Sequence, residues 1–203
     1  MDRSKQSLPQ EIVIRTLTEF LEVAINFVVY VRGVYPAEAF ERRRYLNIPV
    51  QWARHPRLRD YIHSTVATLQ TFIQKDIVER VAVIFSDKNQ VPIEKFVFRL
   101  KVNQSYKLDF PENDLEYALR AFLIKLSASK SMLQPLPDDC TWEILGYFKQ
   151  LPGDASDKGQ FWLPTDTKHW QQPPLITPIK SMSSEPLNVQ LYLEHPSESD
   201  RKL

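Results

Sequence analysis

The apolar residues of this chain recur first at the spacing of an α-helix, and the earliest such segment is apolar on nearly every side. Polar positions in residues 11–32 form one narrow stripe at helical spacing, made of Arg15, Glu19, Glu22 and Asn26. A helix whose remaining surface is apolar is covered by other elements on most sides. Gly33 and Pro36 favour its end. The pattern therefore predicts a central helix over residues 11–32.

The same spacing predicts two further helices. One begins near Pro56, a residue suited to the first turn, and its buried face consists of Leu58, Tyr61 or Ile62, Val66, Leu69, and Phe72 or Ile73. The other spans about residues 111–130, with acidic side chains near its start that favour the positive end of the helix dipole. Residues 36–55 show no clear period and carry a run of arginines, so we expect an irregular loop there.

Alternation of apolar and polar residues replaces the helical period in the remaining ordered segments. Residues 81–85 and 91–101 flank the turn-forming stretch 86–90 and predict a hairpin, with one face made of Phe96, Phe98 and Leu100. Residues 140–148 predict a strand that joins this hairpin, and residues 187–194 predict the last strand. The apolar face of that last strand consists of Leu187, Val189, Leu191 and Leu193, and its polar face of Asn188, Gln190 and Tyr192.

Aromatic residues and prolines without helical periodicity fill the stretch before the last strand, which we interpret as a wrap over the core. The order of elements predicts an α+β domain, with three helices packed on a small antiparallel sheet and a mobile C-terminal segment. We expect a flexible N-terminus over residues 1–10, one domain over 11–194 and a disordered tail over 195–203. Within the domain, the core covers 11–149 and the wrap 150–194.

Composition narrows the class of protein. The 203 residues include 26 basic and 25 acidic side chains, and a net charge of +1 gives no general attraction to nucleic acid or to anionic membranes. A hydrophobic content of 43% supports a core, yet no stretch approaches the ~20 apolar residues of a membrane span. The single cysteine excludes an intramolecular disulfide and fits a reducing compartment, either cytosol or nucleus.

Candidate catalytic groups are sparse. Ser127 and Lys130 match the S-x-x-K spacing of penicillin-binding enzymes, but the partner motifs S-D-N and K-T-G are absent, so a solvated helix end is the simpler interpretation. Cys140 opens a core strand, where a lone cysteine is more often a small apolar residue than a nucleophile. Metal-ligand spacing is missing among the histidines, which are His55, His63, His169 and His195. We therefore predict a protein that is not an enzyme and carries no cofactor.

Arginines and aromatic side chains offer binding chemistry instead. The basic cluster could contact phosphates or could be a solvated surface; it consists of Arg42, Arg43, Arg44, Arg54, Arg57 and Arg59. Tyr61, Trp162 and Trp170 are either core residues or contacts for a partner, since tryptophan and tyrosine dominate binding hot spots. The polar face of the last strand could likewise present a partner surface or meet only solvent.

Several of these segments together resemble the HORMA domain family. The resemblance is carried by Glu19–Ala24, Tyr30–Arg32, Val34–Pro36, Asn47–Val50, His55–Pro56, Pro92–Phe98, Leu119–Phe122 and Gln190–Tyr192. It covers nearly the whole chain, with weaker agreement at 101–114 and 148–170. Within the family, the chain is most similar to accessory subunits of DNA polymerase zeta. The wrap then corresponds to the family's safety belt, a C-terminal segment that closes over a bound peptide, and we call residues 150–194 the belt.

The resemblance implies a non-enzymatic adaptor that clamps a proline-containing peptide of the polymerase zeta catalytic subunit between core and belt. The family's peptide contacts fall on Tyr35, Tyr61 and Trp162. A second surface, for a scaffolding Y-family translesion polymerase, falls on Ile176, Gln190 and Tyr192, and the family has leucine where Ile176 stands. Self-association in the family runs through the positions of Arg42 and Arg120, with Lys130 replacing an acidic residue nearby.

Family membership further implies an open–closed switch, a AAA+ remodelling ATPase acting on the N-terminus, and a nuclear location, with the cytoplasm left open. It implies no membrane partner and little direct binding of nucleic acid. Two alternatives remain at this point. One is a spindle-checkpoint or meiotic HORMA adaptor with other peptides, against which Gln190–Tyr192 and Lys95–Phe98 favour the polymerase member. The other is a protein that binds nucleic acid directly through the arginines of residues 42–59.

Overall fold

A computed structural model of the chain describes residues 9–106, 112–150, 162–165, 170 and 172–197. Its helices are α1 (Pro9–Arg32), α2 (Pro56–Gln74) and α3 (Glu112–Ser129), with two short 3-10 turns, η1 (Ala37–Ala39) and η2 (Lys130–Met132). Its strands are β1 (Phe40–Tyr45), β2 (Ile48–Ala53), β3 (Val78–Ser86), β4 (Pro92–Val102), β5 (Thr141–Phe148), β6 (Leu175–Ser183) and β7 (Leu187–His195). The predicted N-terminus 1–10, the loop after residue 150 and the tail 195–203 lie largely outside these described residues.

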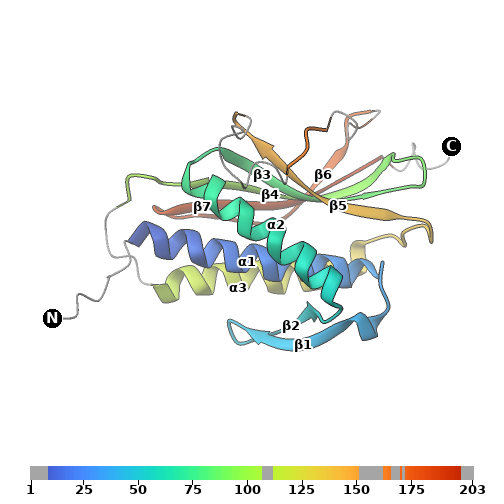
Figure 1. The fold of residues 1–203 in the computed structure, drawn as a ribbon, viewed down its shortest axis with the longest axis horizontal. Helices are drawn as coiled ribbons and strands as arrows, with labels where there is room; N and C mark the ends of the chain where they lie inside the picture. The colour runs from blue at the N-terminus through green and yellow to red at the C-terminus, as the bar shows by residue number, and fades with distance from the viewer. Residues whose placement is uncertain (1–8, 107–111, 151–161, 166–169, 171, 198–203) are drawn as a thin grey trace.

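The elements form layers around α1. One layer is a five-stranded antiparallel sheet in the order β5-β3-β4-β7-β6, and all three helices lie against one of its faces (Figure 1). The small β1–β2 hairpin lies on the far side of α1 from the sheet (Figure 1). The predicted fold class, three helices on a small antiparallel sheet, is therefore confirmed.

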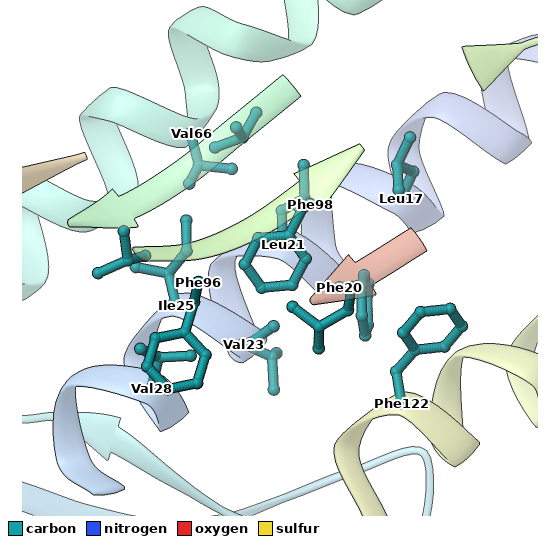
Figure 2. Packing of buried hydrophobic residues seen from close by; sticks show 14 of the residues in the cluster. Leu17, Phe20, Leu21, Val23, Ile25, Val28, Val66, Phe96, Phe98 and Phe122 are labelled. Carbon is teal, nitrogen blue, oxygen red and sulfur yellow. The ribbon is translucent and has the colours of Figure 1, made fainter. Parts of the chain in front are cut away.

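The buried position of α1 follows from its sequence. Its apolar residues fill the space between the layers, and Phe20 meets both Phe98 of β4 and Phe122 of α3 edge to face, with ring centroids 6.3 and 5.7 Å apart (Figure 2). The end of the polar stripe is also covered, because Asn26 is 1% exposed. The Asn26 carboxamide accepts the N–H of Ala53 on β2 at 2.9 Å and so fixes the hairpin to the helix.

The structure corrects the irregular loop expected at residues 36–55, most of which forms the hairpin of β1 and β2. Tyr45 pairs with Ile48, and the two residues between them, Leu46 and Asn47, have φ of 46° and 59°. Positive φ at both central residues is the conformation of a tight two-residue hairpin turn, which asparagine tolerates better than most residues. The prediction was wrong because the run of solvent-facing arginines hid the alternation of a strand with one covered face.

The structure also adds β6, where the sequence predicted only an irregular proline-rich segment. Pro178 lies in this strand, and the pairing with β7 shifts by one residue between Pro178 and Lys180. Proline removes a ladder donor and is tolerated at an edge strand or a bulge, and both conditions hold here. The other predicted strands are confirmed, and β7 buries the apolar face that its alternation predicted. No helix among the described residues is long and apolar enough to cross a membrane.

Candidate functional site

Strand β5 is an edge of the sheet, since among the described strands it pairs with β3 alone. The N–H of Ile144 points away from β3 and meets the hydroxyl oxygen of Tyr61 at 3.1 Å. Backbone groups alternate in direction along a strand, so those of Trp142, Gly146 and Phe148 point to the same open side. An edge of this kind is a template on which another extended chain can add as a strand.

An aromatic cluster stands at one end of this edge and consists of Tyr35, Tyr61 and Trp142. The Trp142 ring lies between the tyrosines, with centroid distances of 6.4 Å to Tyr35 and 5.5 Å to Tyr61, both edge to face. The indole N–H of Trp142 donates to the hydroxyl of Tyr35 at 3.0 Å. The two tyrosines remain 39% and 40% exposed, so the cluster has aromatic surface accessible to solvent.

The hydroxyl of Tyr61 acts as a hydrogen-bond acceptor toward the strand. Partial burial raises the pKa of Tyr61, and the N–H of Ile144 opposes that shift. The phenol is therefore neutral at physiological pH and keeps its proton available as a donor to a second group.

Trp162 stands at the other end of β5. Its ring packs edge to face on Phe148 with centroids 5.4 Å apart, and its indole N–H donates to the Thr68 hydroxyl of α2 at 2.8 Å. Gly146 makes room for this ring, because a Cβ built on Gly146 would lie 3.0 Å from Trp162 and 2.7 Å from Phe148. The glycine thus allows the belt to approach the edge closely on the helical side of the sheet.

Trp170, the next tryptophan along the belt, lies on the opposite face of the sheet. Lys95 and Glu194 are a cross-strand pair on the face away from the helices. The Lys95 ammonium lies 5.2 Å from the Trp170 ring centroid, and the indole N–H donates to Glu194 at 2.9 Å. Trp162 and Trp170 of the belt therefore lie on opposite faces of the sheet.

The residues predicted as peptide contacts fall on this one edge. Tyr35 and Tyr61 lie in the aromatic cluster, and Trp162 lies at the far end of β5; their contact with a peptide stays a prediction. Sequence reasoning missed Trp142 and Gly146. The alternation of residues 140–148 assigned Trp142 to a core strand, and no local pattern places it beside a tyrosine more than a hundred residues earlier.

The residues predicted for a scaffolding polymerase share the outer face of β6 and β7. The register pairs Ile176 with Glu194, Pro178 with Tyr192, and Ser181 with Gln190. Ile176 is 61% exposed, and Gln190 is exposed while Tyr192 is half-buried. Their gathering on one face is a finding, and their partner remains a prediction.

The remaining predicted residues are spread over other elements. Arg42 is exposed on β1, and Arg120 is half-buried on α3; self-association through them stays a prediction. Two arginines of the basic cluster are engaged within the chain. Arg43 pairs with Glu41 at 2.5 Å and lies 5.0 Å from the Trp52 ring centroid, and Arg59 pairs with Asp60 at 3.2 Å.

The candidate catalytic groups do not assemble. Burial raises the pKa of the Cys140 thiol, which keeps it protonated and poorly nucleophilic at neutral pH. Ser127 and Lys130 are exposed at the end of α3. His63 pairs with Glu22 at 3.0 Å and His195 with Thr177 at 3.0 Å, while His169 lies outside the described residues. Within the described part of the chain, no three histidine, cysteine, aspartate or glutamate side chains gather as metal ligands would.

Comparison with known proteins defines the class. The HORMA domain family model matches residues 14–157, and the chain belongs to this family. The chain is 56% identical over 187 residues to a DNA polymerase zeta processivity subunit of Arabidopsis thaliana, a match that covers 92% of this chain and 87% of the relative. It is 36% identical over 195 residues to the human mitotic spindle assembly checkpoint protein MAD2B, with 91% of both chains covered.

Solved structures support the same fold. A chain of the mitotic checkpoint complex superposes with a TM-score of 0.76 at 19% identity and covers 91% of this chain and 98% of that one. HTP-2 of C. elegans, bound to a closure motif of HTP-3, superposes with a TM-score of 0.75 at 11% identity, over 91% and 86% of the two chains. At these identities the likeness establishes the fold alone.

Proposed function

We propose that this chain is the non-enzymatic accessory subunit of a DNA polymerase zeta. In this role it holds an extended, proline-containing peptide of the catalytic subunit along β5 and beneath the belt. The observation that carries the proposal is the open edge of β5, which has aromatic side chains at both ends, together with two belt tryptophans, Trp162 and Trp170, on opposite faces of the sheet. The similarity to a polymerase zeta processivity subunit supplies the partner.

Strand addition accounts for affinity at this edge. The stretch from Trp142 to Phe148 spans about 20 Å at roughly 3.4 Å per residue, which accommodates about six residues of an extended peptide. Outward backbone groups of β5 would hydrogen-bond the peptide main chain, and the aromatic surfaces would select its side chains. Proline suits the aromatic cluster, because its ring packs on tyrosine and tryptophan and it needs no acceptor for an N–H.

The belt would make the release of a bound peptide slow. In this proposal a peptide on β5 lies between two contacts of the belt, that of Trp162 with Phe148 and Thr68 and that of Trp170 with Lys95 and Glu194. It can leave only after one of these contacts opens, so its dissociation is governed by a local opening of the belt. Changes in the affinity of this site for the peptide should therefore appear mainly as changes in the dissociation rate.

The outer face of β6 and β7 provides a second surface in this proposal. Ile176, Gln190 and Tyr192 would contact a scaffolding Y-family translesion polymerase there, with the exposed Ile176 as the apolar contact. The peptide edge and this surface lie on opposite edges of the sheet, so one chain can hold both partners at once. A polymerase zeta subunit works in the nucleus, which we propose as the location of this chain.

Titration calorimetry with a synthetic peptide from the proline-bearing segment of the polymerase zeta catalytic subunit tests this function. We expect Tyr61→Ala to weaken binding about 10-fold or more, because aromatic hot spots cost above roughly 1 kcal/mol when truncated. Tyr117→Ala is the matched control, since Tyr117 is 67% exposed on α3, away from β5. Absence of binding by the folded wild-type protein would overturn the polymerase assignment, and binding of a checkpoint or meiotic closure peptide instead would favour another HORMA role.

A further inference from the structure

The outer face of the sheet carries a strip of hydrogen-bond donors away from the peptide edge. Two neighbouring cross-strand rows make it up, and we call them the donor strip. The first row reads Tyr147, Arg80, Arg99, Gln190 and Ser181 from β5 to β6, and the second reads Lys101, Asn188 and Ser183 from β4 to β6. Neither row contains a carboxylate.

The cationic side chains of the strip lie close enough to repel one another. Arg80 and Arg99 are direct cross-strand partners, and like charges in that position destabilise a sheet. Arg80 lies 4.5 Å from the ring centroid of Tyr147, and its Nε is buried without a hydrogen-bond partner among the described residues. Arg99 and Lys101 are exposed. No described carboxylate forms an ion pair with these three side chains, so their charge is available to an external anion.

Nearby acidic groups lie outside the strip. Glu143 and Glu194 occupy the row at the other end of the same face, where the Trp170 indole N–H donates to Glu194 and Lys95 lies over the Trp170 ring. Glu79 precedes Arg80 at the irregular end of β3, and Glu185 lies in the turn before β7. Among the described residues of the outer face, the positive side chains are therefore concentrated in the strip and the acidic ones lie outside it.

We propose that the donor strip is a contact surface for the phosphate backbone of duplex DNA. The longer row crosses five strands over about 19 Å at roughly 4.8 Å per strand, a length that covers several phosphates of one duplex strand at about 3.4 Å each along the axis. Arginine, lysine and side-chain amides are the groups that hold phosphates without reading sequence. The strip offers no apolar centre of the kind that protein interfaces use.

The same side chains argue against single-stranded nucleic acid. Binding of single strands relies on exposed aromatic rings on which bases stack. Tyr147 is the one aromatic residue of the strip, and the guanidinium of Arg80 already covers it. The surface also differs from the arginines of residues 42–59, of which Arg43 and Arg59 are paired within the chain. The strip would let an accessory subunit contact the template that its polymerase copies, and it stands independently of the peptide edge. Gln190 belongs both to the strip and to the surface proposed for the scaffolding polymerase, so the variants that test the strip change Arg99 and Lys101 instead.

Fluorescence anisotropy of a short labelled DNA duplex, titrated with the full chain between about 50 and 200 mM salt, tests the proposal. We expect a wild-type Kd of about 10⁻⁶–10⁻⁴ M, and for Arg99→Glu/Lys101→Glu a loss of about 10-fold or more with a salt slope lower by about 1.8. The matched control is Arg44→Glu/Arg54→Glu, which changes the charge equally on exposed residues of the hairpin region and should retain most of the affinity. Peptide binding at β5 should be unchanged in both variants.

Three outcomes would overturn the proposal. The first is absence of duplex binding by the wild-type protein at low salt. The second is an equal loss of affinity in the two charge-reversal variants, which would show a general charge effect. The third is tighter binding of the single-stranded oligonucleotide, or of an acidic peptide, than of the duplex. Unchanged thermal unfolding of Arg99→Glu/Lys101→Glu confirms that a loss of binding is not a loss of fold.

Discussion

Replacing Arg32 by alanine is expected to lower the free energy of unfolding by about 3–5 kcal/mol, because the change leaves Glu94 buried without its guanidinium partner. Arg32 ends α1, Glu94 lies on β4, and both side chains are 5% exposed. The Arg32 guanidinium also donates to the carbonyl of Gln134 at 2.7 Å and lies 6.0 Å from the Phe85 ring centroid. One side chain thus joins the central helix, the sheet and the segment that leads into β5.

Urea unfolding followed by circular dichroism measures this effect. Arg15→Ala is the matched control, since the Arg15–Glu19 pair is about half exposed on the same helix and such pairs contribute about 0–1 kcal/mol. The double variant Arg32→Met/Glu94→Leu should recover most of the lost stability, because it removes both buried charges together. A loss below about 1 kcal/mol for Arg32→Ala would contradict a buried, structurally important ion pair.

The second large effect is expected at the belt. Trp162→Ala should weaken binding of the catalytic-subunit peptide about 30- to 1,000-fold, equivalent to about 2–4 kcal/mol, with most of the change in the dissociation rate. The substitution removes the ring that packs on Phe148 over Gly146 and the hydrogen bond to Thr68. It thereby removes both the aromatic side chain at one end of β5 and a contact between the belt and α2.

Biolayer interferometry with the immobilised peptide separates the two rates. Trp162→Phe is the control for shape, since it keeps an aromatic ring on Phe148 but loses the indole N–H, and we expect a smaller loss of about 5-fold for one hydrogen bond. Wild-type dissociation kinetics in Trp162→Ala would show that this residue neither contacts the peptide nor limits opening of the belt.

Much of the core could be predicted because its signals are local. The helical period around Phe20 and the alternation of Phe96 and Phe98 each reveal a buried face, and these faces meet in the structure (Figure 2). The alternation of Leu187, Val189 and Leu191 likewise predicted β7 and its buried face.

Other features could not be read from local patterns. The hairpin of β1 and β2 was hidden by exposed arginines, and β6 by Pro178 and a shift in register. The aromatic cluster joins Tyr35 to Trp142 across the whole core, a contact that depends on the order of strands in the sheet and not on any period in the sequence. The contact between Gly146 and Trp162 could not be predicted either, because it depends on where the belt meets β5, and composition alone does not specify that.

The most direct test of peptide addition to β5 is hydrogen exchange of the Gly146 amide, followed by NMR with and without the catalytic-subunit peptide. This N–H points to the open side of β5, whereas the neighbouring Ile144 N–H is already bonded to Tyr61. The account predicts that saturating peptide slows exchange at Gly146 by about 100-fold or more, as expected when an edge amide enters a protected ladder. Unchanged exchange at Gly146 while the peptide is fully bound would contradict strand addition at this edge.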